Sequence, residues 1–245
     1  MPICEITGIL KSGCRKGNKK HRSRSRGRDP SGTYAMKLLL IRHGQTAWNR
    51  EQVFRGGTDI GLDETGREQA RLLAERLKLS GVARIYSGPL SRARQTAQAI
   101  ADACGREVSV DPGLDDMRFG LWEGMAHTEV AEKHPDEYQV WRTEPWKVRI
   151  PGGSTLDEVG DRAWSALQAL TLESGERDVV AVVTHRVVLK LLALRMLGLG
   201  PEGFWKVKLS PCSLSVFEWD GDGFVMQSFN DTCHLAGMGE QPHDF

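Results

Sequence analysis

Two histidines and two arginines in this sequence each follow a short apolar run. They are Arg42 and His43 after residues 37–41, Arg92 shortly after residues 84–87, and His185 after residues 179–183. Short apolar runs bounded by polar residues predict strands that are covered on both faces. In open parallel sheets, ligands bind at the carboxyl ends of the strands. If the three strands are neighbours, the four side chains converge on one pocket.

The chemistry that suits such a pocket is the binding and transfer of a phosphate dianion. A guanidinium group offers a planar fork that matches phosphate oxygens, and a neutral imidazole is a nucleophile that can carry a phosphoryl group. Taken singly, each residue has a plainer explanation: a histidine after a strand can be a structural hydrogen-bonding residue, and Arg42 can pair with a surface carboxylate. Their occurrence together at strand ends favours the phosphate pocket.

The elements that must position these residues alternate along the chain. Apolar residues at helical spacing, such as Ala70, Leu73, Ala74 and Leu77, predict a helix over 63–79. A capping box at Thr155 and Glu158 opens another helix that runs to about Leu172. Further helices are expected around 93–100 and over 187–197, and further strands over 108–110, 214–219 and 224–229. The pattern predicts an α/β fold with three layers: a doubly wound, mostly parallel sheet with helices on both faces.

One long segment departs from this alternation. Residues 113–153 are rich in Gly, Trp and Pro, with a single helical patch near Thr128–His134. We expect an irregular excursion that forms the lid of the pocket. The tryptophans, scattered and without interleaved basic residues, are expected to pack in the core or the lid.

Four ordered blocks of the sequence carry a family resemblance. They are Leu40-Ile41-Arg42-His43-Gly44-Gln45-Thr46-Ala47-Trp48-Asn49, Tyr86-Ser87-Gly88-Pro89-Leu90-Ser91-Arg92-Ala93-Arg94-Gln95-Thr96-Ala97, Gly120-Leu121-Trp122-Glu123-Gly124 and Val183-Thr184-His185. Over about Met36 to Leu235, the chain resembles the histidine phosphatase superfamily, the phosphoglycerate-mutase-like enzymes. Only about 35 residues separate Asp116 from Gly152, which resembles the shorter, phosphatase-like branch.

The resemblance implies a role for each matching residue. His43 would be the phosphohistidine nucleophile, and Arg42, Arg92 and His185 would hold the equatorial phosphoryl oxygens. Asn49 would contact the phosphate or orient the nucleophilic loop. Fixed donors of this kind stabilise the charge that spreads over a transferring phosphoryl group. No cofactor and no metal are implied.

The proton donor for the leaving group is expected to be Asp116. The family usually places a Glu at this step, and here the segment contains Asp115 and Asp116 instead, one methylene shorter. Asp115 and Glu123 are the alternatives, although a structural ion pair is the favoured explanation for Glu123. A carboxyl group among so many cations normally has a lowered pKa, so it would need desolvation or a bound phosphate to act as an acid near neutral pH.

Two further positions depart from the family pattern. Arg186 stands where a Gly is common, and either adds charge to the mouth of the pocket or points to solvent at a helix start. The block Pro151-Gly152-Gly153-Ser154-Thr155 lacks the Glu of the family. Any substrate contact that this Glu makes is therefore absent.

The resulting prediction is a phosphomonoesterase that acts through a phosphohistidine on a small phosphorylated metabolite. One alternative is a cofactor-dependent phosphoglycerate mutase, which returns the phosphoryl group to a sugar acid. The other is a phosphate-binding regulatory protein with weak or no turnover, which the departures at Asp116 and Arg186 motivate.

Composition divides the 245 residues into two parts. Residues 1–35 hold nine Lys and Arg against Glu5 and Asp29, while the whole chain has a net charge of +1. With no apolar period, this segment is expected to be a disordered basic extension, and residues 36–245 to be the catalytic domain. A nucleic-acid arm is the alternative for the extension, but no nucleic acid is expected at the domain.

The five cysteines are widely spaced and odd in number, which favours a reducing compartment and hence the cytoplasm. No apolar run approaches the roughly 18 residues of a membrane span, so no membrane partner is expected. A homodimer is left open.

Overall fold

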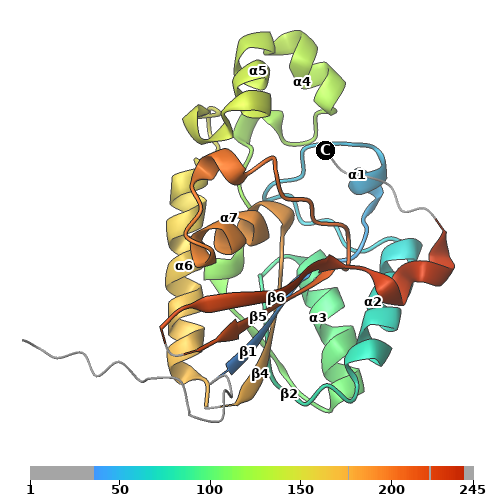
Figure 1. The fold of residues 1–245 in the computed structure, drawn as a ribbon. Helices are drawn as coiled ribbons and strands as arrows, with labels where there is room; N and C mark the ends of the chain where they lie inside the picture. The colour runs from blue at the N-terminus through green and yellow to red at the C-terminus, as the bar shows by residue number, and fades with distance from the viewer. Residues whose placement is uncertain (1–35, 176, 221, 240–245) are drawn as a thin grey trace, which may run out of the picture.

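The computed structural model describes residues 36–175, 177–220 and 222–239, drawn in colour in Figure 1, so the expected basic extension lies outside the described residues. The strands are β1 (Met36–Arg42), β2 (Val82–Ser87), β3 (Val108–Val110), β4 (Asp178–Thr184), β5 (Leu214–Trp219) and β6 (Phe224–Asp231). The α-helices are α1 (Ala47–Arg50), α2 (Glu64–Leu77), α3 (Ser91–Cys104), α4 (His127–Lys133), α5 (Pro135–Thr143), α6 (Leu156–Glu173) and α7 (Arg186–Met196). Short 3₁₀ turns occupy 112–114, 120–122, 145–147, 201–203 and 233–238. No helix among these described residues is long and apolar enough to cross a membrane.

The strands of the described chain form one six-stranded sheet in the order β3-β2-β4-β1-β5-β6. The first four strands of this order run parallel to one another, and β5 is antiparallel to both β1 and β6. The expected strands and the mostly parallel sheet are therefore confirmed.

Two apolar clusters cover the two faces of the sheet. Along β1, Leu38 and Leu40 belong to one cluster, while Leu39 and Ile41 belong to the other. This alternation is the period of two that a strand imposes on its side chains. Figure 1 shows α6 and α7 on one side of the sheet and α2 and α3 on the other. The chain thus has the three layers that its sequence predicts.

The capping signals in the sequence mark the helix starts. Asp63 accepts a hydrogen bond from the Gly66 amide at the start of α2. Thr155 and Glu158 form the expected capping box at the start of α6. These bonds satisfy backbone amides that the first turn leaves without an intrahelical partner.

The excursion at 113–153 is more helical than the sequence predicts. The expected patch is α4, but α5 follows it directly and was not predicted. Pro135 begins α5, with Asp136 and Glu137 in its first turn, which suits a helix N-terminus. Figure 1 shows α4 and α5 stacked beyond one end of the sheet, away from the flanking helices.

The connections after β1 and β4 leave the sheet on opposite faces. From β1 the chain passes to α2 on one face, and from β4 it passes to α7 on the other. Since β1 and β4 are neighbours, their carboxyl ends open a crevice between the diverging segments. His43 and His185 are the residues that follow these two strands, so the fold places both at the crevice.

The loop that carries His43 also depends on a close approach to α2. A Cβ atom added at Gly66 would lie 2.0 Å from the Gln45 carbonyl oxygen, and one added at Gly44 would lie 2.6 Å from the Gly66 carbonyl oxygen. The absence of a side chain at both glycines therefore lets the two backbones touch beside the loop that carries His43.

We expect Gly66→Ala to displace this loop, lower the free energy of unfolding by about 1–3 kcal/mol, and lower kcat. The matched control is Gly160→Ala inside α6, where a Cβ atom meets only Leu191 side-chain atoms at 3.8 Å or more. That control should stabilise the protein by about 0.4–1 kcal/mol. Denaturant melts and steady-state rates on both variants check the pair, and equal effects would contradict the prediction.

Candidate active site

The structure brings the side chains that the sequence predicts for the phosphate pocket together at the carboxyl ends of β2, β4 and β1, which are adjacent. Arg42 pairs in register with Thr184, and the His43 amide donates to the Thr184 carbonyl at 3.0 Å. The ring centroids of His43 and His185 lie 5.2 Å apart. The two histidines therefore face one small volume from neighbouring strands.

His43 is buried, and one of its ring nitrogens is held by the backbone. Its Nδ1 lies 2.7 Å from the Gly44 carbonyl oxygen. A carbonyl only accepts hydrogen bonds, so Nδ1 carries the proton and Nε2 keeps its lone pair. Burial, followed by electrostatic interactions with Arg92, His185 and Arg42, holds the pKa of His43 well below its usual value. The imidazole is therefore neutral near pH 7.

His185 is also buried and neutral, but its proton lies on the other nitrogen. Arg92 Nε donates to His185 Nδ1 at 3.3 Å, and this leaves the proton on Nε2. Burial is the main cause that lowers the pKa of His185 to about 3, although the Asp116 carboxylate 3.5 Å from Nδ1 opposes it. The Nε2 atom is buried without a hydrogen-bond partner among the described residues.

Arg92 is fully buried at the start of α3, and most of its guanidinium is already engaged. Nη1 donates to the Thr58 carbonyl at 2.8 Å, and Nη2 donates to the Gly56 carbonyl and to Asp116 Oδ2, both at 2.9 Å. These bonds fix the plane of the guanidinium before any substrate arrives. Among the described residues, Arg92 Nη1 makes one of the two hydrogen bonds that it can donate.

Asp116 lines the same pocket as His43, and its carboxylate accepts a hydrogen bond from the guanidinium of Arg92. Burial raises the pKa of its carboxyl group, but interactions with His185, Arg92 and Arg55 outweigh burial and lower it. The Met117 amide also donates to Oδ1 at 2.9 Å. Asp116 is thus a carboxylate in the unliganded protein.

Arg42 is fully buried, and its Nη1 donates to the Leu209 carbonyl at 2.7 Å. Asn49 is buried too, and its Oδ1 accepts from the amide and the hydroxyl of Thr46, each at 2.9 Å. Of the two roles expected for Asn49, these bonds fit the orientation of the nucleophilic loop. Thr96 adds to this support, because its hydroxyl accepts from the Gly44 amide at 3.0 Å.

The loop that carries Asp116 is pinned from two sides. Arg162 of α6 donates to the carbonyls of Pro112, Gly113, Asp115 and Asp116 at 2.9–3.2 Å. On the sheet side, the Thr184 hydroxyl donates to the Leu114 carbonyl at 2.6 Å. The backbone from which the carboxyl group of Asp116 extends is therefore held in place.

The two alternative acids have other partners. Asp115 accepts from the Asp116 amide and does not line the pocket. Glu123 accepts from the amides of Gly57 and Phe119 and from the Thr58 hydroxyl. The structural explanation for Glu123 is supported, but the described residues hold it by hydrogen bonds and not by the expected ion pair.

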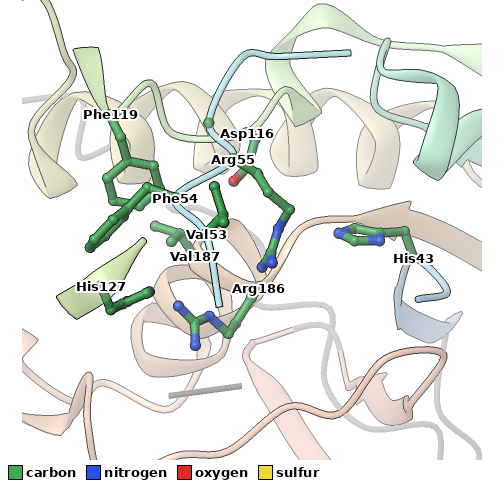
Figure 2. Close-up of a pocket in the computed structure, with 10 residues that line it drawn as sticks. His43, Val53, Phe54, Arg55, Asp116, Phe119, His127, Arg186 and Val187 are labelled. Atoms are coloured by element: carbon green, nitrogen blue, oxygen red, sulfur yellow. The ribbon is translucent and has the colours of Figure 1, made fainter. Parts of the chain in front are cut away.

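Three residues extend the pocket beyond the predicted set. Arg55 and His127 line it, and neither was singled out as a site residue. Both lie in irregular segments or at a helix start, away from the strand ends that guided the analysis. Arg186 also lines the pocket and is buried, so of its two expected orientations the structure shows the one that adds charge to the site. Figure 2 shows these side chains around the pocket with His43 and Asp116.

No three His, Cys, Asp or Glu side chains gather as a candidate metal site in the part of the chain that the structure describes. The large tryptophans lie where the sequence predicts, with Trp122 and Trp141 in the core and Trp146, Trp164 and Trp205 packed against it.

Comparisons with known proteins agree with this geometry. The family model of the histidine phosphatase superfamily (branch 1) matches residues 38–232. Phosphoserine phosphatase 1 of Hydrogenobacter thermophilus is 34% identical over 208 residues, which are 85% of this chain and 98% of that protein. A probable phosphoglycerate mutase GpmB of Yersinia enterocolitica is 35% identical over 210 residues, 82% of this chain and 95% of that protein.

The fold has a close counterpart among solved structures. Bacillus stearothermophilus YhfR superposes with a TM-score of 0.78 at 30% identity, covering 82% of this chain and 100% of that chain. Residues 38–232, which the family model matches, contain His43, His185, Arg42, Arg92 and Asp116. This chain belongs to the histidine phosphatase superfamily.

Proposed function

We propose that the protein hydrolyses phosphomonoesters by transferring the phosphoryl group first to His43 and then to water. The observation that carries the proposal is the state of His43: a neutral imidazole, with its Nδ1 proton held by the Gly44 carbonyl, among buried guanidinium groups. An imidazole of this kind offers the Nε2 lone pair to phosphorus. The surrounding cations and the Nε2–H of His185 stabilise the charge on the transferring oxygens.

In the first step, a bond forms between His43 Nε2 and phosphorus while the bond from phosphorus to the ester oxygen breaks. The leaving oxygen takes the electron pair of that bond and needs a proton. Asp116 lines the pocket beside His43 and is the group that we assign to supply it.

Asp116 must be protonated to do so, and the substrate itself favours this. A bound phosphate dianion repels the carboxylate and competes with it for Arg92, so the pKa of Asp116 rises when the substrate binds. The proton then moves to the leaving oxygen, and Asp116 is left as a carboxylate.

In the second step, water attacks the phosphohistidine. The Asp116 carboxylate takes a proton from the attacking water, the new bond from oxygen to phosphorus forms, and the bond between nitrogen and phosphorus breaks. The electron pair returns to His43 Nε2, and inorganic phosphate leaves.

A small phosphorylated metabolite fits the site as substrate. The pocket is small, and it combines polar groups such as His43 and Asp116 with the apolar side chains of Phe54 and Val187. The relative named phosphoserine phosphatase supports a small phosphomonoester. Cytoplasmic location stays a prediction from the cysteine pattern.

A mutase is the second candidate, favoured by the relative named a probable phosphoglycerate mutase. It would use the same phosphohistidine but return the phosphoryl group to a sugar acid. The two functions therefore differ only in the acceptor of the second step, which can be measured directly.

We expect the full chain, mixed with p-nitrophenyl phosphate and quenched, to carry an acid-labile phosphoryl group on the peptide that contains His43. His43→Ala should lose this label and all but a few per cent of turnover, with an unchanged melting temperature. Release of inorganic phosphate in step with the alcohol supports the phosphatase, whereas transfer to added sugar acid supports the mutase. A protein that binds phosphate but never becomes labelled would refute both.

The two active-site histidines should stay neutral well into the acid range. An exposed histidine titrates near pH 6.5, but burial lowers the pKa of His43 and takes that of His185 to about 3. The imidazole nitrogen NMR signals are assigned by their loss in His43→Ala and His185→Ala. Those of His185 should not shift between about pH 8 and pH 5, and those of His43 should titrate with a midpoint well below pH 6.5.

The sign of the linked stability change follows from these pKa shifts. Below about pH 6.5 the unfolded chain binds protons at these histidines and the folded chain does not, so unfolding becomes easier as the pH falls toward 3. His185→Ala should weaken that dependence. A midpoint near pH 6.5 for either signal would show that burial does not lower the pKa of that imidazole, which would contradict the prediction.

Asp116→Asn should slow alkyl phosphate esters far more than aryl esters. An alkoxide leaves poorly without a proton, and loss of proton donation typically costs about 10²–10⁴ in rate, whereas a nitrophenolate leaves unaided. Asp115→Asn is the matched control, since that carboxyl group lies outside the pocket. Steady-state rates on a pair of alkyl and aryl phosphates decide the matter. Equal losses on both classes in Asp116→Asn would remove Asp116 as the acid.

A further inference from the structure

A turn of the chain just before β5 contacts both residues at which β1 passes into the nucleophilic loop, and the mechanism above gives this turn no role. It comprises residues 209–213 and is called the supporting turn below. Its Leu209 carbonyl accepts a hydrogen bond from Arg42 Nη1 at 2.7 Å. Its Cys212 amide donates to the His43 carbonyl at 3.2 Å. The supporting turn therefore fixes the guanidinium of Arg42 and the backbone of His43.

The backbone of the supporting turn is strained. The Ser213 amide donates to the Ser210 carbonyl at 3.1 Å, with Pro211 and Cys212 between them. Cys212 has a φ of 54°, in the left-handed region that favours glycine. A residue in this region costs free energy, and it keeps that conformation only where its surroundings hold it. The neighbours of the turn therefore decide where the Cys212 amide points.

Asn230 is the neighbour that holds the supporting turn through its side chain. It lies on β6, beside β5 (Figure 1). Its Oδ1 accepts from the Ser210 amide at 2.6 Å, and its Nδ2 donates to Ser210 Oγ at 3.5 Å. Its own amide donates to Ser215 Oγ of β5 at 3.0 Å. One half-buried asparagine thus ties the turn to the last two strands of the sheet.

An irregularity in β6 directs Asn230 to the turn. The register of β5 with β6 shifts between Leu214 and Val216, so residues 229–230 stand opposite Ser215 alone. Two residues opposite one form a β-bulge, which bends the strand and re-aims a side chain. Asn230 has a φ of 54°, and asparagine adopts this conformation more readily than other residues with a side chain. Bulge and residue type therefore agree in presenting the amide to the turn.

We propose that Asn230 is a positioning residue for phosphoryl transfer: its side-chain amide fixes the supporting turn, and the turn fixes Arg42 and His43. The proposal rests on the phosphatase function proposed above and adds a residue to its machinery. Asn230 is not among the described residues that line the pocket, so it acts through the turn and not on the substrate. Misplacement of a reacting group by about 1 Å costs about 100-fold in rate, so a small shift of the turn is enough to slow the reaction.

Asn230→Gly tests the proposal, because it removes the amide while glycine adopts the same backbone conformation without strain. We expect kcat on p-nitrophenyl phosphate, measured well below the melting temperature, to fall by about tenfold or more. Asn230→Asp should restore most of kcat, since its carboxylate still accepts from the Ser210 amide and Asp also tolerates a positive φ.

Gln227→Gly is the matched control on the same strand. Gln227 is exposed, and its Nε2 donates to Glu218 Oε2 of β5 at 2.8 Å. This variant also introduces a glycine into β6 and removes an amide that bonds to β5, but it leaves the supporting turn intact. It should lower the melting temperature and leave kcat unchanged, which separates loss of stability from loss of positioning.

The imidazole nitrogen NMR signals of His43 give a second readout, which needs no turnover. They should shift in Asn230→Gly and keep their positions in Asn230→Asp and in Gln227→Gly. If Asn230→Gly does not fold, Ser215→Ala takes its place, because it removes the acceptor of the Asn230 amide and displaces the same residue more mildly. The same His43 signals should then shift in Ser215→Ala.

Unchanged kcat or unchanged His43 signals in a folded Asn230→Gly variant would overturn the proposal, and so would equal losses of kcat in Asn230→Gly and Asn230→Asp. Unchanged His43 signals in Ser215→Ala have the same meaning where that variant is the one that folds. Absence of turnover and of a phosphorylated His43 in the unaltered protein would instead count against the phosphatase function. The NMR comparison then decides the role of Asn230 by itself.

Discussion

The site depends on a neutral imidazole kept inside a cluster of buried cations. Arginines stay charged when they are buried, whereas histidines lose their proton, so the same burial that is costly for Arg42 and Arg92 leaves His43 neutral, the state that its proposed role as nucleophile requires. Backbone carbonyls of residues such as Gly56, Thr58 and Leu209 accept the guanidinium hydrogens. The donors are therefore fixed before a phosphate binds, which is the condition under which they stabilise a transition state better than water does.

The topology of the sheet makes this cluster possible. β1 and β4 are adjacent and parallel, yet their following segments pass to opposite faces, so polar residues at the two strand ends meet across an open crevice. β2 lies on the far side of β4 and directs the start of α3, with Arg92, to the same edge. Strands buried on both faces shift little, and this rigidity is passed on to the side chains at their ends.

The regular part of this arrangement could be predicted from the sequence, because strand and helix periods and helix caps are local signals. The same signals predict which side chains lie at the ends of three strands. The order of these strands in the sheet, which makes them neighbours, comes from the structure. Arg55 and His127 could not be found in this way, since their positions depend on how an irregular segment and the excursion at 113–153 fold over the sheet. The helix α5 was missed for a related reason: it is short, and much of its stabilisation comes from packing of Trp141 and not from a repeating apolar pattern.

The resemblance to the family implies a Glu at this step, and here the residue is Asp116. The position of the carboxyl oxygens therefore depends more on the backbone and less on the side-chain torsions. A longer acid can adjust its reach through an extra rotatable bond, whereas Asp116 places its oxygens wherever its loop stands. That loop is held by the carbonyl bonds of Arg162 on one side and by the Thr184 hydroxyl on the other. Thr184 is also the residue that accepts from the His43 amide and precedes His185. One residue at the end of β4 thus fixes the proposed acid, the proposed nucleophile and the second histidine relative to one another, so a shift of this strand end would disturb all three at once.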